Sequence, residues 1–240
     1  MKIYITTYLL VISIYSFAQD KILVNYIYKN EFDISNIEDH FILNLYKNSN
    51  DKTFYYTLLI DGQEAIYENV DRIDNSQEKD KPAITGPLGK SYMNLHTRET
   101  LYEAELAEKY IIKDTISKID WVIERERGSY LGLETRKATY KNEYLSYEAW
   151  FVPSIPLKFG PNSYGDLPGL IVKFTHYFTN KFGSHKRIIV AENIEINPKI
   201  KLQKPTKGKL ISQKDFNKIV EEQNKKYQEI ENNQVETKLD

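Results

Sequence analysis

Three features of the chain have residue types that chemistry at a protein site could use: a glycine-rich loop, a serine beside prolines, and four histidines. Residues 86–91, GPLGKS, end like a phosphate-binding loop, in which backbone amides and a lysine surround phosphate groups. The full pattern requires glycine five residues before Gly89, where Ile84 stands, and Pro87 has no amide hydrogen to donate. The sequence therefore predicts no nucleotide site here.

The other candidates also lack the spacing that their chemistry needs. A nucleophile elbow requires glycine two residues before its serine, and Pro161 stands there before Ser163. The histidines at 40, 96, 176 and 185 show no short metal-ligand spacing. His176 and His185 could meet across a hairpin, although solvated or strand-face histidines are far more common. We therefore predict a protein that is not an enzyme, with no catalytic residue, metal or cofactor; a hydrolase is the third alternative.

The first eighteen residues have the features of a secretory signal. Lys2 precedes an apolar stretch, and Ser16 and Ala18 are the small residues that a signal peptidase reads. We expect cleavage before Gln19. The alternative is an uncleaved membrane anchor, but the apolar stretch is shorter than the ~20 residues that a spanning helix needs. The sequence thus predicts export to the periplasm or cell envelope, and a mature chain that is soluble and has no transmembrane segment.

Charge and composition restrict the partners. The chain has 33 basic and 34 acidic residues, which argues against nucleic acid. It has no cysteine, so disulfides and cysteine-metal sites are excluded. Residues 199–218 are rich in lysine. Either they contact an anionic lipid or sugar, or they form a solvated linker, which is the more common case.

The spacing of apolar residues predicts mostly strands. Nineteen tyrosines and ten phenylalanines suit a half-buried pleated surface. A two-residue period marks strands in residues 22–28, 54–60, 118–126, 145–151, 170–178 and 187–196. Residues 99–113 have helix-forming composition but also fit that period, which favours strands. Residues 71–82 are polar and aperiodic, and we interpret them as a mobile loop. Strands without intervening helices favour an antiparallel sheet.

The carboxy-terminal region follows a different, helical period. Ser212 and Asp215 have the spacing of a helix start, and apolar residues then recur at helical intervals. We predict a helix over residues 213–229 and a frayed end over residues 232–240. The predicted organisation is a signal peptide (1–18), a β domain (19–211), and a helix with its tail (212–240). The predicted fold is mainly β: a single large curved antiparallel sheet, like a half-open barrel, with a C-terminal α-helix.

Residues 147–174 hold the highest density of aromatic, proline and glycine residues in the chain. Three prolines between residues 152 and 164 deny hydrogen bonds to a sheet, so this segment is expected to connect two strands rather than form one. Pro168 fixes its own φ, and Gly169 is expected to supply a positive φ or a close backbone approach. Trp150 is expected beneath or beside this connection. The run serves either packing, which we favour, or a ligand.

Within this run, residues 165–171, GDLPGLI, resemble the signature of the GLPGLI family of exported Bacteroidetes proteins if Asp166 is an insertion. The context is similar too: Ala149-Trp150-Phe151, Ile155-Pro156, Gly160-Pro161 and Tyr164, with Trp121 and Lys137-Ala138 upstream. Thr135 stands where many members have cysteine. The resemblance implies an exported protein of a family without established biochemistry.

Two functions from different classes remain. The first is a non-enzymatic binding or accessory protein for an apolar or peptide-like ligand, held by an aromatic-lined curved sheet. The second is a structural or protein-interaction module of the envelope that engages a partner protein. A hollow interior favours the first, and a filled core favours the second. The candidate binding residues are Trp150, Phe151, Tyr164, Leu167, Pro168 and Gly169.

Overall fold

The computed structural model describes residues 21–70, 81–87, 89–143 and 145–236. Its main element is one twelve-stranded sheet in the order β12-β6-β5-β4-β3-β2-β1-β11-β10-β9-β8-β7. The strands are β1 (Ile22–Glu31), β2 (Thr53–Asp61), β3 (Glu64–Asn69), β4 (Lys90–Asn94), β5 (Glu99–Glu105), β6 (Lys109–Thr115), β7 (Val122–Tyr130), β8 (Leu133–Lys141), β9 (Ser146–Val152), β10 (Leu170–Asn180), β11 (Gly183–Ile196) and β12 (Lys209–Ser212). All neighbours are antiparallel except β12 and β6. The predicted curved, mainly β fold is confirmed.

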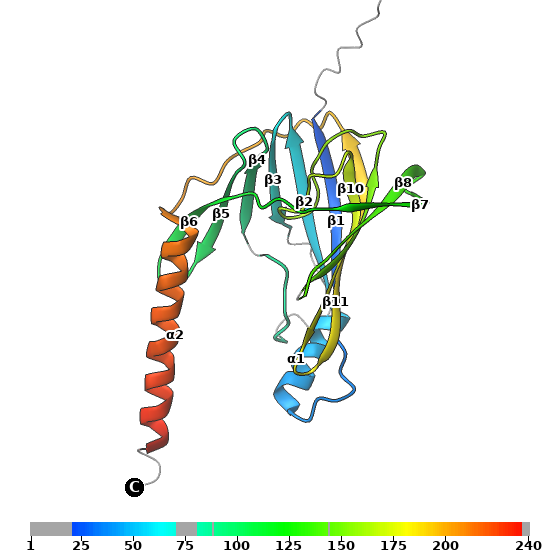
Figure 1. Cartoon of the computed structure of the whole chain (residues 1–240). Helices are drawn as coiled ribbons and strands as arrows, with labels where there is room; N and C mark the ends of the chain where they lie inside the picture. The colour runs from blue at the N-terminus through cyan, green and yellow to red at the C-terminus, as the bar shows by residue number, and fades with distance from the viewer. Residues whose placement is uncertain (1–20, 71–80, 88, 144, 237–240) are drawn as a thin grey trace, which may run out of the picture.

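The sheet is strongly curved, and its two ends face each other across an open side (Figure 1). The strand register shifts at Asn25/Tyr26, Ile171/Lys173 and Ile123/Arg127, and these shifts are β-bulges or similar irregularities of the strand pairing. Such irregularities increase local twist and bending. Because β6 and β7 lie near opposite ends of the strand order, their connection must cross the open side. We call residues 116–121 the crossing link. The expected strand over residues 118–126 is correct only from Val122 onward, because residues 118–121 belong to this link.

Alternation along the central strands places one set of side chains in the concave core. Val24, Tyr26 and Tyr28 of β1 are buried there with Tyr56 and Leu58 of β2. The strands expected over residues 22–28, 54–60, 145–151, 170–178 and 187–196 are confirmed, and residues 99–113 form β5 and β6 as favoured.

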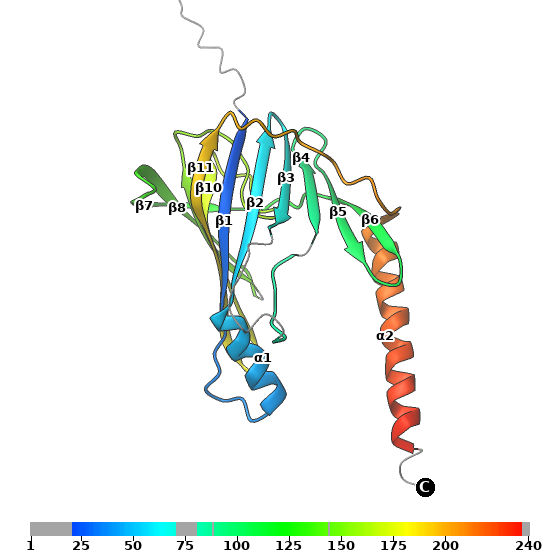
Figure 2. The same ribbon diagram turned by 180° about the vertical axis from the view of Figure 1, so that it is seen from behind.

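Helix α1 (His40–Asp51) closes the lower end of the sheet (Figures 1 and 2). The Asp39 carboxylate caps it by accepting hydrogen bonds from the backbone amides of Phe41 and Ile42. Tyr46 packs with Phe32 and Ile37 in a second small core. Helix α1 was not predicted from the sequence. Its asparagines, serine and aspartate have low helix propensity, and the tertiary packing outweighs that preference.

Residues 197–208 cross the convex face from β11 to β12, as Figure 2 shows from behind. We call this segment the strap. The Lys204 ammonium lies 2.6 Å from the Glu64 carboxylate and 4.5 Å from the centre of the Tyr92 ring. Pro198 and Pro205 are buried. The two prolines and Lys204 attach the strap to the sheet, while its lysines are exposed, so the interpretation as a solvated linker holds for most of the segment.

Helix α2 (Gln213–Glu236) begins at the predicted residue and extends away from the sheet (Figure 1). The Ser212 hydroxyl accepts from the Asp215 amide at 3.1 Å and donates to its carboxylate at 2.7 Å, so the predicted start is confirmed. The helix continues beyond residue 229 to Glu236, so residues 232–236 are helical and the prediction of a frayed end is wrong for them. Glutamate and glutamine in that stretch have high helix propensity.

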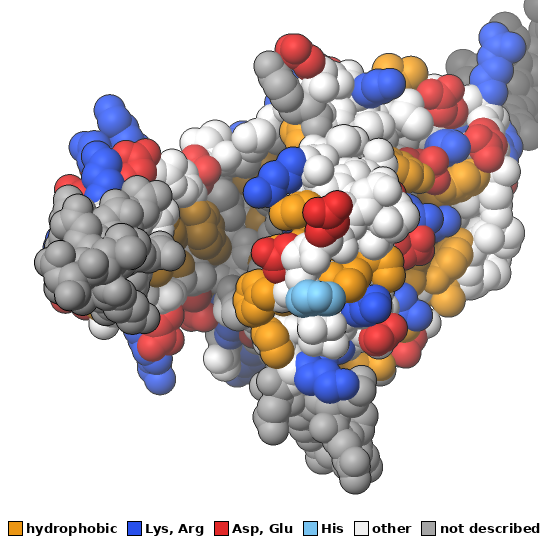
Figure 3. Space-filling model, turned by 90° about the horizontal axis from the view of Figure 1, so that it is seen from below, with side chains coloured by type: hydrophobic (Ala, Val, Ile, Leu, Met, Phe, Trp, Pro, Cys, Tyr) orange, Lys and Arg blue, Asp and Glu red, His pale blue; other side chains and the backbone are white. Residues whose placement is uncertain are grey.

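Three expectations fall outside the part of the chain that the structure describes: the signal peptide at 1–18, nearly all of the loop at 71–82, and the end of the frayed tail at 237–240. Within the described residues, no helix is long and apolar enough to cross a membrane. Seen from below, a hollow separates the α2 side from the rest of the molecule, with hydrophobic side chains in its depth (Figure 3).

Candidate functional site

The site begins with the connection between β9 and β10, residues 153–169, which we call the crossover. It forms no strand, as expected, and lies against the concave face of the sheet. Phe159 and Leu167 are buried in the main core. The Leu170 amide donates to the Ile155 carbonyl, and the Ile171 amide donates to the Phe159 carbonyl, both at 3.0 Å. The crossover thus fills one half of the concavity.

Gly169 allows the crossover to approach the sheet closely. A Cβ atom at Gly169 would lie 2.3 Å from the Val152 carbonyl oxygen and 2.9 Å from a Phe151 ring carbon. Its φ is not in the left-handed region. Of the two reasons expected for glycine here, close backbone approach is therefore correct and positive φ is not.

The crossing link holds the crossover from above. The Trp121 indole Nε1 donates to the Gly165 carbonyl at 2.8 Å. One nitrogen of the Arg98 guanidinium lies 2.7 Å from the Asp166 carboxylate, and the other donates to the Ile116 carbonyl at 2.9 Å. Asp166 has a φ of 68°, a conformation that aspartate tolerates better than most residues. The residue that interrupts the signature therefore anchors the crossover to the β4–β5 turn.

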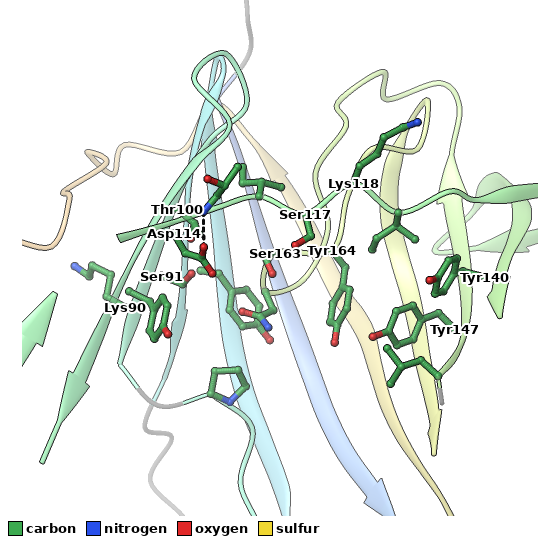
Figure 4. A pocket seen from close by; sticks show the side chains of 18 of the residues that line it. Lys90, Ser91, Thr100, Asp114, Ser117, Lys118, Tyr140, Tyr147, Ser163 and Tyr164 are labelled. Carbon is green, nitrogen blue, oxygen red and sulfur yellow. Dashed lines mark hydrogen bonds between the residues drawn. The ribbon is translucent and has the colours of Figure 1, made fainter. Parts of the chain in front are cut away.

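The other half of the concavity is an open cleft with a volume of about 520 Å³. Figure 4 shows its two walls: Ser91, Thr100 and Asp114 from β4, β5 and β6 on one side, and Tyr140, Tyr147 and Tyr164 on the other. Ser117 and Lys118 of the crossing link lie along its upper rim. Five tyrosines line the cleft in all: Tyr67, Tyr102, Tyr140, Tyr147 and Tyr164.

Tyr67 is the most unusual of these residues. Its side chain is 1% exposed and stacks on the Tyr56 ring, with centroids 5.0 Å apart. Its buried hydroxyl has no hydrogen-bond partner among the described residues. Burial raises the pKa of Tyr67 well above its usual value, with a further contribution from the neighbouring phenols. Burial also raises the pKa of Tyr164 and of Tyr147. These phenols therefore stay protonated at neutral pH and can donate hydrogen bonds.

The six predicted binding residues do not form one surface. Phe151, Leu167 and Gly169 are buried in the core, Pro168 is exposed, and Tyr164 lines the cleft.

Trp150 lies on the opposite face of the sheet from the crossover, so its expected position was wrong. Its Nε1 donates to the Glu148 carboxylate at 3.0 Å, and the Lys137 ammonium lies 5.7 Å from its ring centre. Its neighbours Ala149 and Phe151 point into the core instead. Because successive strand residues face opposite sides, burying Phe151 turns Trp150 outward. Trp121 takes the place that was expected for Trp150.

The structure also places the residues that were first considered for chemistry. Gly89, Lys90, Ser91 and Ser163 all line the cleft. The rings of His176 and His185 both contact the Phe178 ring. Among the described residues, no group of three or more histidine, cysteine, aspartate or glutamate side chains could hold a metal ion.

The wall formed by β3 to β6, which contributes Tyr67, Thr100, Tyr102 and Asp114, was not among the predicted site residues. A signal was present in the two-residue period over residues 99–113, which puts Thr100, Tyr102 and the β6 residues opposite them on one face. The strand order that brings this face toward Tyr164 cannot be read from the spacing of residues along a single strand.

Residues 96–173 match the family model Porph_ging, described as a protein of unknown function. The matched region is less than half of the chain, and it includes the crossing link and the crossover. Thr135, at the position where the GLPGLI resemblance leads one to expect cysteine, is buried on β8 opposite Gly128. No curated protein matches the chain.

Two solved structures of one protein resemble the fold. The structure of PNGF-II in the C2 space group gives a TM-score of 0.54 at 17% identity, over 84% of this chain and 32% of that one. The P21 form gives 0.53 at 15% identity, over 83% and 32%. The chain therefore spans about a third of the length of PNGF-II. At this identity the likeness concerns the fold alone.

Proposed function

We propose that this protein binds a peptide-like ligand in the cleft on its concave face and performs no chemistry on it. The observation that carries the proposal is the tyrosine-lined cleft of about 520 Å³ with the unpartnered Tyr67 hydroxyl in its wall. That volume lies within the ~300–1,000 Å³ range of typical small-ligand sites. A buried hydroxyl without a partner costs stability, and a ligand acceptor would offset that cost.

The wall chemistry favours a peptide-like ligand over an apolar one. Tyrosine rings offer flat apolar surfaces, and Ser91 and Ser163 place hydroxyl groups between them. An acyl chain would cover these hydroxyls without pairing them. An extended peptide presents both amide donors and carbonyl acceptors, so it satisfies hydroxyls while its side chains pack on the rings.

The proposal includes export and membership of the GLPGLI family. Residues 1–18 support export through their charge, apolar stretch and small residues. Residues 165–171 support the family assignment, with Asp166 as an insertion that forms an ion pair of its own. Intact-mass measurement of the protein from the periplasmic fraction should give a chain that begins at Gln19. Retention of residues 1–18 would contradict the soluble, exported form.

Native mass spectrometry after gentle purification from the host envelope tests the binding proposal. The wild-type protein should carry an additional bound mass. Ser163→Trp, which places a large ring in the cleft, should lose it, whereas the exposed control Ser129→Trp on β7 should keep it. Absence of any bound mass on the wild-type protein, or its retention by Ser163→Trp, would refute binding in the cleft.

A second function, a protein-interaction module, is favoured by the end strand β7. Its backbone edge is open in the strand order, and Val122 and Ile123 are 60% and 39% exposed. Such an edge can accept a strand from a partner. Capture of an envelope protein that is lost in Val122→Lys but unchanged in Ser163→Trp would favour this function over ligand binding.

A further inference from the structure

A second, smaller cavity adjoins the cleft. It has a volume of about 330 Å³ and shares Pro87, Asn162 and Tyr164 with the cleft wall. His176 of β10 and Arg187 of β11 form part of its lining, and they lie directly opposite each other in the sheet. A ligand in the cleft could therefore extend past Tyr164 toward this basic end.

Arg187 provides a positive charge without a counter-charge. Its guanidinium lies 4.7 Å from the Phe178 ring centre, and its Nε is buried without a hydrogen-bond partner among the described residues. No described carboxylate forms an ion pair with it; the ion pairs of the neighbouring Lys186 and of Arg98 involve other acids. A buried guanidinium donor that lacks an acceptor is costly unless a ligand supplies one.

His176, which lines the same cavity, also has a polar atom without a hydrogen-bond partner. Its Nε2 is also buried without a partner among the described residues. Burial lowers the pKa of His176, and the charge of Arg187 lowers it further. The imidazole is therefore neutral at neutral pH and can present Nε2–H as a donor. Four described side chains have a buried polar atom without a partner, and three of those side chains, Tyr67, His176 and Arg187, belong to the lining of these two joined cavities.

We infer that the ligand carries a carboxylate group and that Arg187, together with His176, binds it. The inference rests on the proposed binding function and specifies the ligand as a peptide-like molecule with a free carboxylate at one end. The planar guanidinium matches the two oxygens of a carboxylate, and charge-assisted hydrogen bonds of this kind are stronger than neutral ones. The tyrosine-lined cleft would hold the remainder of the ligand.

NMR titration of the full chain with two matched probes tests the inference. N-acetyltyrosine has a free carboxylate, whereas N-acetyltyrosinamide has the same ring and acetyl group with a neutral end. The acid should bind at least about tenfold more tightly than the amide, with shifts at His176 and Arg187. Arg187→Gln should abolish this preference, Arg187→Lys should restore part of it, and the exposed control Arg125→Gln on β7 should leave it unchanged.

Failure of carboxylate recognition can be distinguished from failure of the binding proposal, which the native mass measurement tests. Equal binding of acid and amide, no binding of either probe, or a preference that survives Arg187→Gln would overturn carboxylate recognition, whatever mass the purified protein carries. If inorganic phosphate binds at Arg187 more tightly than N-acetyltyrosine, the inference of a carboxylate ligand would be wrong and a phosphate group would replace it. Because the comparison of acid with amide uses the wild-type chain, it remains decisive if Arg187→Gln fails to fold.

Discussion

The two halves of the concave face are built from similar residues, but one half is tightly packed and the other is open. Over β1, β9 and β10, the crossover fills the concavity so tightly that Gly169 has no space for a Cβ atom. Toward β4, β5 and β6, the same sheet leaves a cleft of about 520 Å³. The crossover separates the two halves, with Leu167 buried on one side and Tyr164 in the cleft wall on the other.

Two tyrosines show what this difference means. Tyr26, in the filled half, donates its hydroxyl to the Ile171 carbonyl at 2.5 Å. Tyr67, beside the cleft, is equally buried, but its hydroxyl has no partner in the described structure. The filled half satisfies its polar groups internally, as a stable core requires, whereas the open half leaves polar groups available. The tightly packed region and the proposed binding region are thus different parts of one sheet.

The largest expected effect concerns the filled half. Gly169→Ala should lower the free energy of unfolding by about 3 kcal/mol, because the new methyl group meets the Val152 backbone, which cannot move aside easily. Gly132→Ala is the matched control. It has φ of 75° but nothing within 4 Å of the added atom, and it should cost about 1 kcal/mol. Urea denaturation measures both. Equal costs would show that the crossover is not tightly packed at Gly169.

The second prediction compares the two tyrosines directly. Tyr26→Phe should lower the free energy of unfolding by ~1–3 kcal/mol, because the Ile171 carbonyl loses its donor. Tyr67→Phe should leave stability unchanged or raise it by up to about 1 kcal/mol, because it removes an unpartnered buried hydroxyl. It should also weaken ligand binding. A Tyr67→Phe protein as destabilised as Tyr26→Phe would mean that the open half is packed in the same way as the filled half.

The third prediction concerns the contact that joins the crossover to the β4–β5 turn. Asp166→Asn keeps a residue that tolerates positive φ but removes the charge opposite Arg98. Both side chains are partly exposed, so the loss should be about 1 kcal/mol or less. Thermal melts at low and high salt should converge, since salt screens the wild-type pair but not the variant. A salt-independent difference would show that the ion pair is not the source of the effect.

The smallest expected effect lies on the convex face, outside both halves. The hydrogen bonds from Lys204 and then from Tyr92 lower the pKa of Glu64 below its usual value of 4.5. Its contribution is therefore present above pH 4.5 and is lost as the pH falls through the lowered value. Glu64→Gln should cost ~0.5 kcal/mol at neutral pH and progressively less as the pH falls below 4.5 in urea melts. A difference that persists in acid would assign the effect to packing of the strap.

Local patterns in the sequence were sufficient to predict the sheet and the start of α2. Alternating aromatic and aliphatic residues identify β1 and β2, and Ser212 with Asp215 identifies the helix start. The cleft could not be predicted in the same way. It depends on β6 and β7 lying near opposite ends of the sheet, a consequence of strand order that residue spacing does not determine. Trp150 shows the same limit, because a periodic pattern groups the residues of a face but does not say which face is inside.

The central claim is that the open half binds a ligand through the unpartnered Tyr67 hydroxyl. A crystal structure of the protein with its co-purified ligand, or with N-acetyltyrosine, tests this most directly. We expect the ligand between Tyr67, Thr100 and Tyr164, with a polar ligand atom about 2.7–3.0 Å from the Tyr67 hydroxyl oxygen. An empty or collapsed cleft with the ligand bound elsewhere, or a Tyr67 hydroxyl that pairs with protein atoms instead, would contradict the claim.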